Sequence, residues 1–131
     1  MATIFTRIIR GEIPCYKVAE DERFFAFLDI NPLHEGHTLV VPKEEKDYVF
    51  DLDDSTLSGL ILFSKKLAAA IEKAVPCKRI GVAIVGLEVP HLHVHLIPMD
   101  SMADIDFTRP KMKFAQEQFA ETAARIAGSL K

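Results

Sequence analysis

The sequence predicts an α+β domain in which an antiparallel sheet of about five strands carries its helices mainly on one face. Short strand-type segments recur at hairpin spacing, one long helical pattern divides them into two groups, and a second helical pattern ends the chain. The chain has 131 residues, of which 49% are hydrophobic and 27% are charged. This is enough for one domain with a real core, so we expect residues 1–131 to form a single domain.

The first third of the chain is predicted to hold a short N-terminal helix and three strands. The helix stops at Gly11, which suits the left-handed conformation that commonly follows a helix. Two strands are expected over residues 15–21 and 24–30, joined by a short charged turn, and a buried strand over 37–42. The apolar stripe of the helix consists of Ile4, Phe5, Ile8 and Ile9.

A long central helix is predicted over residues 53–76. Its apolar and small side chains keep the 3.6-residue period, Asp53 can cap its N-terminus, and Pro76 prevents continuation. The predicted inward face consists of Leu57, Leu60, Ile61, Ser64, Leu67, Ala68, Ile71 and Val75.

Two further strands and a final helix complete the predicted fold. The strands are expected over residues 79–87 and 91–99. The C-terminal helix is expected to begin at Pro110 and to end at Gly128. Its predicted inward side chains are Met112, Ala115, Phe119 and Ile126.

Charge and cysteine content exclude several classes of protein. The net charge of −3 gives no electrostatic footprint for nucleic acid or an anionic membrane, and no apolar run reaches the length of about 20 residues that spans a bilayer. The apolar stretch at the N-terminus is too short for a secretory signal. Cys15 and Cys77 alone cannot build a disulfide framework, so we expect a cytoplasmic protein with reduced thiols.

The segment PHLHVHLIPM carries three of the five histidines in the chain at every second position. On a strand, His91, His93 and His95 would share one face, available to a ligand. The residues between and after them would point into the core, and these are Leu92, Val94 and Leu96.

The pattern of the histidines leaves three chemical interpretations open. They can be polar residues on a solvated face, ligands of a metal ion, or the imidazoles of a catalytic site. Two histidines on alternate strand positions can chelate zinc, but the third ligand must come from elsewhere. Catalysis explains all three, because a neutral imidazole can attack phosphorus while neighbouring imidazoles orient it and stabilise the spread negative charge of the transition state.

The motif HLHVHLI is the His-φ-His-φ-His-φ-φ signature of the histidine triad (HIT) family of nucleotide hydrolases and transferases, where φ is a hydrophobic residue. The chain resembles the purine-nucleotide phosphoramidase branch of that family. The segments IFTRIIRGEIP, AEDERFFAFLDINP and GHTLVVPK are similar to its N-terminal helix, strand pair and first-histidine strand, in the same order. The resemblance implies a HIT-like fold and a homodimer whose sheets continue across the interface. It implies no cofactor.

The resemblance also implies roles for individual residues. His93 would be the nucleophile that takes up a nucleoside monophosphate, with His91 and His95 beside it and His37 in support from a neighbouring strand. Asp29 would contact the ribose hydroxyls. The apolar slot for the base would be formed by Phe5, Ile8, Phe27, Leu28 and Ile30.

Some of these residues also have a purely structural interpretation. On the pattern alone, Phe27 and Ile30 fit a core, Asp29 fits a turn, and His37 fits a structural histidine.

The sequence departs from the family pattern in two places. Many bacterial relatives carry Cys-x-x-Cys near the start and a His after the VPK strand, as part of a structural zinc site. Here these positions are Thr3, Thr6 and Glu45, and the threonine hydroxyls are poor zinc ligands compared with thiolates, so we predict no structural zinc and no metal site. Before the triad, Leu87 and Glu88 replace the usual Gln and hydroxyl residue, which places Glu88 among the substrate-binding positions. Its carboxylate would disfavour a nearby anionic phosphate, or it could instead accept a proton from an incoming amine or orient a histidine.

The resulting functional hypothesis is a nucleotide phosphoramidase or hydrolase that cleaves a nucleoside 5′-monophosphate, AMP or GMP, from its leaving group through a nucleotidyl-histidine at His93. Its substrate partner would be a purine nucleotide or nucleoside phosphoramidate. The alternatives are a nucleotide-binding protein with weak or lost catalysis, a dinucleoside polyphosphate hydrolase, and a metalloenzyme.

Overall fold

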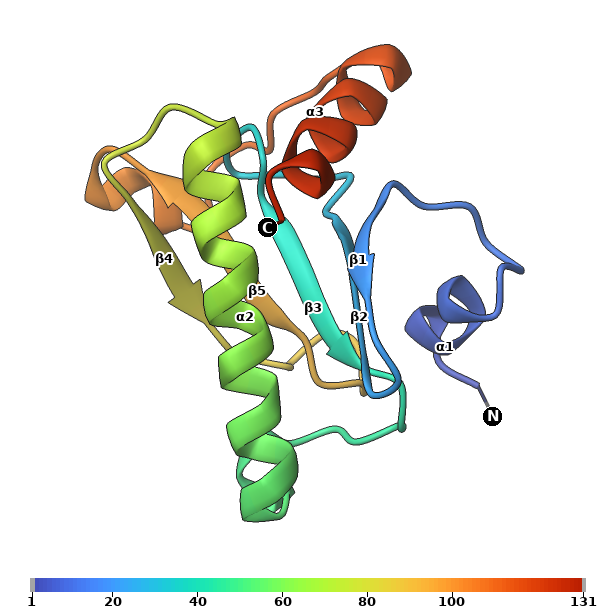
Figure 1. Cartoon of the computed structure of the whole chain (residues 1–131). Helices are drawn as coiled ribbons and strands as arrows, with labels where there is room; N and C mark the ends of the chain where they lie inside the picture. The colour runs from blue at the N-terminus through green and yellow to red at the C-terminus, as the bar shows by residue number, and fades with distance from the viewer. Residues whose placement is uncertain (1, 131) are drawn as a thin grey trace.

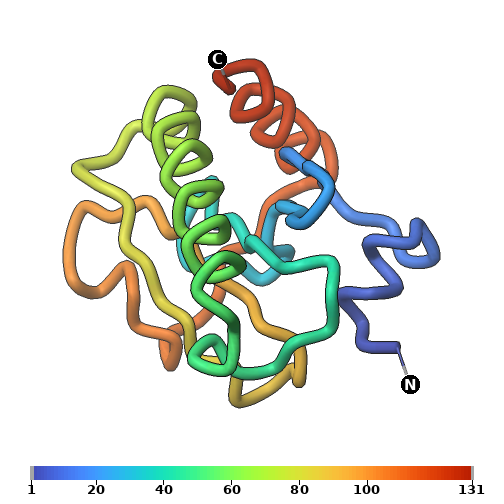
Figure 2. Tube along the Cα trace, turned by 60° about the horizontal axis from the view of Figure 1, so that its bottom comes forward, coloured from blue at the N-terminus to red at the C-terminus, as the bar shows by residue number. Residues whose placement is uncertain are grey.

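The computed structural model describes residues 2–130 and has the predicted α+β architecture, with a five-stranded antiparallel sheet in the order β1-β2-β3-β5-β4 (Figure 1). Helices α2 and α3 cover one face of the sheet and lie side by side (Figures 1 and 2). The strands are β1 (Lys17–Glu20), β2 (Phe24–Leu28), β3 (Thr38–Pro42), β4 (Arg79–Ala83) and β5 (Val94–Met99). The helices are α1 (Ile4–Ile9), α2 (Asp54–Ala74) and α3 (Gln116–Gly128), with short 3-10 turns η1 (Val49–Asp51) and η2 (Met102–Ile105).

The sheet has an apolar cluster on each face. The larger cluster lies beneath the two long helices and includes Leu60, Leu67, Ile71 and Ile126. On the opposite face a smaller cluster packs against α1, and it consists of Phe5, Phe25, Phe27, Leu39 and Val41. Alternation along the strands sends successive side chains to opposite faces, so the two clusters follow directly from the period of two.

Helix α2 matches its prediction in most respects. The side chain of Asp53 accepts a hydrogen bond from the backbone N–H of Thr56 at 2.8 Å, which is the expected N-cap. The prediction that Ile61 points inward is wrong, because this side chain is exposed. Ile61 lies at the margin of the apolar stripe, where a rotation of one position moves a side chain from core to solvent.

Several helices and strands are shorter in the structure than predicted. Strands β1 and β2 each lose residues to the turns beside them, and β4 ends at Ala83 rather than at residue 87. Helix α3 begins at Gln116 rather than at Pro110, and the inward placement of Met112 is wrong because that side chain is exposed. Ala115 is the exposed N-cap residue of α3 rather than an inward position.

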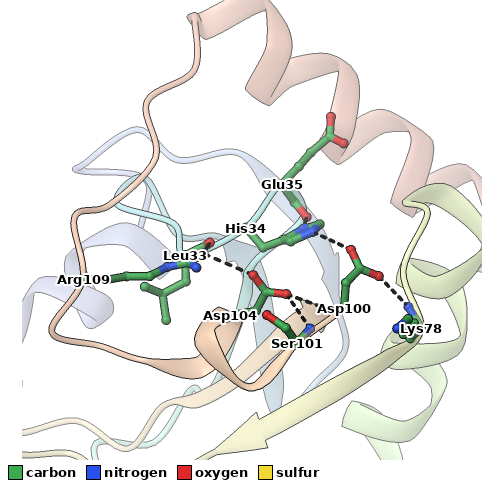
Figure 3. A network of polar contacts seen from close by, with 8 residues as sticks. All are labelled: Leu33, His34, Glu35, Lys78, Asp100, Ser101, Asp104 and Arg109. Carbon is green, nitrogen blue, oxygen red and sulfur yellow. Dashed lines mark hydrogen bonds and ion pairs between the residues drawn. The ribbon is translucent and has the colours of Figure 1, made fainter.

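Residues 106–115, which we call the strap, run in irregular conformation from η2 to α3. The Arg109 guanidinium donates to the carbonyl of Leu33 and pairs with the Asp104 carboxylate at 3.3 Å (Figure 3). The backbone N–H of Met112 donates to the carbonyl of Pro32 at 2.8 Å. These bonds commit the backbone of the strap to the loop before β3, which explains why the helix starts late.

Within residues 2–130, none of the helices combines the length and the apolar character needed to cross a bilayer.

Candidate active site

The four predicted site histidines lie together on the face of the sheet opposite α2. Strand β5 begins only at Val94, so the predicted strand over 91–99 is too long, and His91 and His93 lie in the extended segment before it. The predicted alternation holds across this boundary, because Leu92, Val94 and Leu96 belong to the cluster beneath the helices. The histidines are not an open stripe, since His91, His93 and His95 are only 0%, 8% and 9% exposed.

His93 is held in one tautomer by its own backbone segment. Its Nδ1 lies 2.8 Å from the carbonyl oxygen of His91, which can only accept, so Nδ1 carries the hydrogen. In the neutral ring the lone pair is then on Nε2, which is the form that can attack an electrophile. The ring is packed edge-on between Phe5 and His95, with centroid distances of 5.1 Å and 5.0 Å.

His37 and His95 form a directed chain of hydrogen bonds. The backbone N–H of Leu33 donates to His37 Nδ1 at 3.0 Å, so the neutral His37 ring carries its hydrogen on Nε2. That nitrogen lies 2.9 Å from His95 Nδ1 and donates to it, which leaves the N–H of His95 on Nε2. His95 thus keeps a free donor that can bind an anionic oxygen in the site.

Burial keeps this pair neutral. Desolvation, together with the neighbouring His95, lowers the pKa of His37 to about 3. Desolvation and the neighbouring His93 lower the pKa of His95 to about 4. Both imidazoles are therefore uncharged at neutral pH, as the hydrogen-bond directions require.

Asp29 follows β2 and lies beside the histidine pair. Its Oδ2 is 3.6 Å from His37 Nε2, and its Oδ1 accepts the backbone N–H of Asn31 at 2.8 Å. Burial raises the pKa of this carboxyl group, with the charge of Glu88 acting in the same direction. One oxygen thus caps the turn while the other faces the site.

Two groups in the described residues have ligand atoms close enough to hold a metal ion. The first consists of Asp29, His37 and His95, and the second consists of His34, Asp100 and Asp104. In the first, both nitrogens of His37 are already committed to Leu33 and His95. In the second, Asp104 Oδ2 accepts the backbone N–H groups of Asp100 and Ser101 (Figure 3). Hydrogen bonding inside the fold accounts for both groups.

The three positions that depart from the zinc pattern are linked by hydrogen bonds, and one of them, Thr3, contacts His91. Thr3 Oγ1 lies 2.6 Å from His91 Nδ1, and Thr6 Oγ1 donates to Glu45 Oε2 at 2.6 Å.

The absence of structural zinc stays a prediction. We expect elemental analysis of purified protein to find zinc far below one equivalent, and a stoichiometric, tightly held zinc would contradict it.

Some, but not all, of the residues predicted to form the base slot lie together in the structure. The rings of Phe5 and Phe27 contact each other in the smaller apolar cluster, with a centroid distance of 5.6 Å. Ile8 packs against that cluster. Ile30 lies at the rim and is 62% exposed. The side chain of Leu28 is not part of the slot, since it is buried in the cluster beneath the helices. This placement contradicts the prediction for Leu28, and the reason is that it alternates with Phe27 along β2.

The segment before the triad is a solvent-exposed turn. Gly86 adopts φ 74°, which favours glycine, and Leu87 is 89% exposed. Glu88 is also exposed, close enough to Asp29 to act on its pKa. The structure therefore places a negative charge near the site but does not bury it.

Sequence reasoning missed one residue that touches the triad directly. Phe107, in the strap, lies edge-on to His95 with a centroid distance of 4.8 Å. No periodicity marks Phe107, because the strap is irregular. The sequence offered only a weak signal, since the strap contains a second phenylalanine, Phe114, and nothing in the pattern separates the two.

Comparison with known proteins identifies the family of the chain. A family model described as the HIT domain matches residues 10–102. An uncharacterized HIT-like protein of Borreliella burgdorferi is 37% identical over 132 residues, which cover 95% of this chain and 95% of that protein. An adenosine 5′-monophosphoramidase of Schizosaccharomyces pombe is 39% identical over 100 residues, or 75% of this chain and 74% of that protein.

Solved structures give the same result. A HIT-like protein from Bartonella henselae matches with a TM-score of 0.83 and 34% identity, over 98% of this chain and 96% of that one. The family model covers well over half of the sequence, and the histidines it is named for form the cluster described above. The chain therefore belongs to the histidine triad (HIT) family.

Proposed function

We propose that the protein hydrolyses nucleoside 5′-phosphoramidates to the nucleoside monophosphate, with AMP or GMP as the nucleotide. The observation that carries this proposal is the tautomer of His93, whose Nδ1–H is committed to the carbonyl of His91 and whose Nε2 is free to attack. The similarity to an adenosine 5′-monophosphoramidase supports the choice of substrate class.

The proposed reaction has two steps. His93 Nε2 attacks phosphorus, the bond from phosphorus to the leaving amine breaks, and the amine departs with a proton taken from solvent water, which the second step returns. Water then attacks the phosphorus of the nucleotidyl-histidine, which releases the monophosphate and restores the imidazole. The N–H on His95 Nε2 is directed by the chain from Leu33 and supplies a hydrogen bond to the phosphoryl oxygens.

The binding of the nucleoside is assigned to the surroundings of His93. Phe5, Ile8 and Phe27 would pack on the base, with Ile30 at the rim, and Asp29 would accept hydrogen bonds from the ribose hydroxyls. No metal or other cofactor is needed for either step as proposed.

The assay that tests this function uses adenosine 5′-phosphoramidate with and without a chelator. We expect release of AMP that resists chelation. Binding of the nucleotide without release of AMP would favour a nucleotide-binding protein instead. Preferential cleavage of a dinucleoside polyphosphate in the same panel would favour the dinucleotide hydrolase.

Glu88 should restrain this activity. The exposed carboxylate lies near the phosphate site, so Glu88→Ser should raise kcat/KM for adenosine 5′-phosphoramidate by about 3- to 10-fold, with a smaller gain at high salt. Glu44→Ser, on a neighbouring exposed loop, is the control. Unchanged kinetics of Glu88→Ser on every substrate would make Glu88 irrelevant.

We also propose that the protein is a homodimer. Strand β4 is an edge of the sheet, and an exposed edge favours pairing with another strand. Exposed apolar side chains lie on β4, just after it and on α2, which are Val82, Val85, Ile61 and Leu62. Sedimentation velocity should give a particle with twice the mass of one chain. The Val82→Lys variant should sediment with the mass of a single chain.

A further inference from the structure

The N-terminus of α1 is fastened to the loop after β3 by one carboxylate. Glu45 Oε2 accepts the backbone N–H of Thr3 at 2.7 Å and the hydroxyl of Thr6 at 2.6 Å. These two bonds lower the pKa of the Glu45 carboxyl group, the bond from Thr6 contributing most. The carboxylate therefore stays charged and holds two donors of the same helical turn.

The same turn is tied to the first histidine of the triad. Thr3 Oγ1 accepts the backbone N–H of Thr6 at 3.1 Å and lies 2.6 Å from His91 Nδ1. His91 Nε2 lies 2.8 Å from the carbonyl of Pro42, so Nε2 carries the hydrogen and Nδ1 accepts the Thr3 hydroxyl. Both ring nitrogens of His91 are thereby held.

His91 in turn holds the proposed nucleophile. Its carbonyl accepts the Nδ1–H of His93, and the ring of Phe5 lies against both imidazoles, at 5.6 Å from His91 and 5.1 Å from His93. Phe5 stands between Thr3 and Thr6 in sequence, so the bonds of the two threonines hold the backbone on both sides of it.

Helix α1 needs such fastening. It has only six residues and no acidic side chain in its first turn, and an isolated helix of this length is unstable. The apolar cluster accounts for the burial of Phe5, but the hydrophobic effect is non-directional, so burial alone does not anchor the backbone turn that carries Phe5. Hydrogen bonds to a charged group are directional and are among the strongest available.

We propose, on the basis of the function proposed above, that Thr3, Thr6 and Glu45 form a clamp of positioning residues. The clamp sets the ring of Phe5 against His91 and His93 and so shapes the nucleoside slot. It works through paired oxygen and nitrogen atoms and needs no metal ion, because each donor in it already has an acceptor, either within the clamp or, for the Thr3 hydroxyl, at His91 Nδ1.

The test compares two variants that open the clamp with two that leave it intact. Glu45→Ala removes the acceptor, and Thr6→Val removes one donor at nearly constant volume. Glu44→Ala removes the neighbouring carboxylate, whose one ion pair within residues 2–130 is with Lys46 at 3.0 Å, and Thr6→Ser keeps the hydroxyl. Melting temperatures show that each variant is folded at the temperature of the assay.

Two readouts separate positioning from stability. By calorimetry, Glu45→Ala and Thr6→Val should raise the Kd for AMP by about 5- to 20-fold, while Glu44→Ala and Thr6→Ser stay near wild type. In the background of Phe5→Leu the same clamp variants should change the Kd by less than about twofold, because the clamp acts through that ring.

Nuclear Overhauser contacts between the rings of Phe5 and His93 should weaken in the two open variants of the free protein. Clamp variants that retain these contacts and the wild-type affinity would overturn the proposal. A wild-type protein that binds neither AMP nor GMP would instead overturn the proposed nucleotide specificity. The contacts between the rings of Phe5 and His93 would then be the only test of the clamp.

Discussion

Replacing His93 with Ala should lower kcat for adenosine 5′-phosphoramidate by at least about 10⁴-fold, because the variant has no atom to take up the nucleotide. The remaining donors, including Nε2–H of His95, would still bind the phosphate, so the Kd for AMP should change little. Steady-state kinetics and calorimetry on the same preparation give both numbers.

The matched control is His34→Ala. His34 lies in the loop before β3, where its Nδ1 bonds to the carbonyl of Glu35 at 2.8 Å, and it makes none of the contacts of the triad. This variant should keep wild-type kcat. A His93→Ala protein that retained a tenth of the activity would show that another group is the nucleophile.

The stability of the protein should fall steeply in mildly acidic solution. His37 and His95 have folded-state pKa values of about 3 and about 4, against 6.5 for the free side chain. Because the unfolded chain binds more protons below pH 6.5, the stability that these neutral histidines contribute is present above that pH and is lost as the pH falls toward 4. The burial of His91 acts in the same direction.

Urea unfolding should give a free energy lower by about 2–4 kcal/mol at pH 4.5 than at pH 7, which is a large part of the stability of a small domain. Asp29 opposes this effect, since its raised pKa favours the folded state at low pH. The double variant His37→Gln/His95→Gln should have a clearly shallower pH dependence, and His34→Gln should not. A wild type with constant stability over this range would contradict the neutral pair.

Much of the fold follows from local patterns. The period of two in the strands and the 3.6-residue period of α2 identify which side chains face the helices, and the cap at Asp53 locates the start of α2. The error at Leu28 was avoidable, because Phe27 and its neighbour cannot both face the same slot on a strand. The late start of α3 could not be predicted from local patterns, because it depends on hydrogen bonds from the strap to Leu33 and Pro32.

The hydrogen-bond partners of the site histidines could not be predicted from the sequence. The histidine motif predicts that three imidazoles share a face, but the tautomer of each ring depends on a partner distant in the chain. Thr3 and His91 are 88 residues apart, and His37 and His95 are 58 apart. Such pairs follow from the strand order of the sheet and the position of α1, which no local pattern encodes.

The proposed reaction requires a covalent bond between His93 Nε2 and the phosphorus of the nucleotide. The most direct measurement is intact-protein mass spectrometry of samples quenched at alkaline pH during turnover of adenosine 5′-phosphoramidate, followed by peptide mapping. We expect one added AMP on the peptide that carries His93, present in wild type and absent in His93→Ala. Turnover by wild type with no adduct at any quench time, or an adduct that persists in His93→Ala, would contradict it.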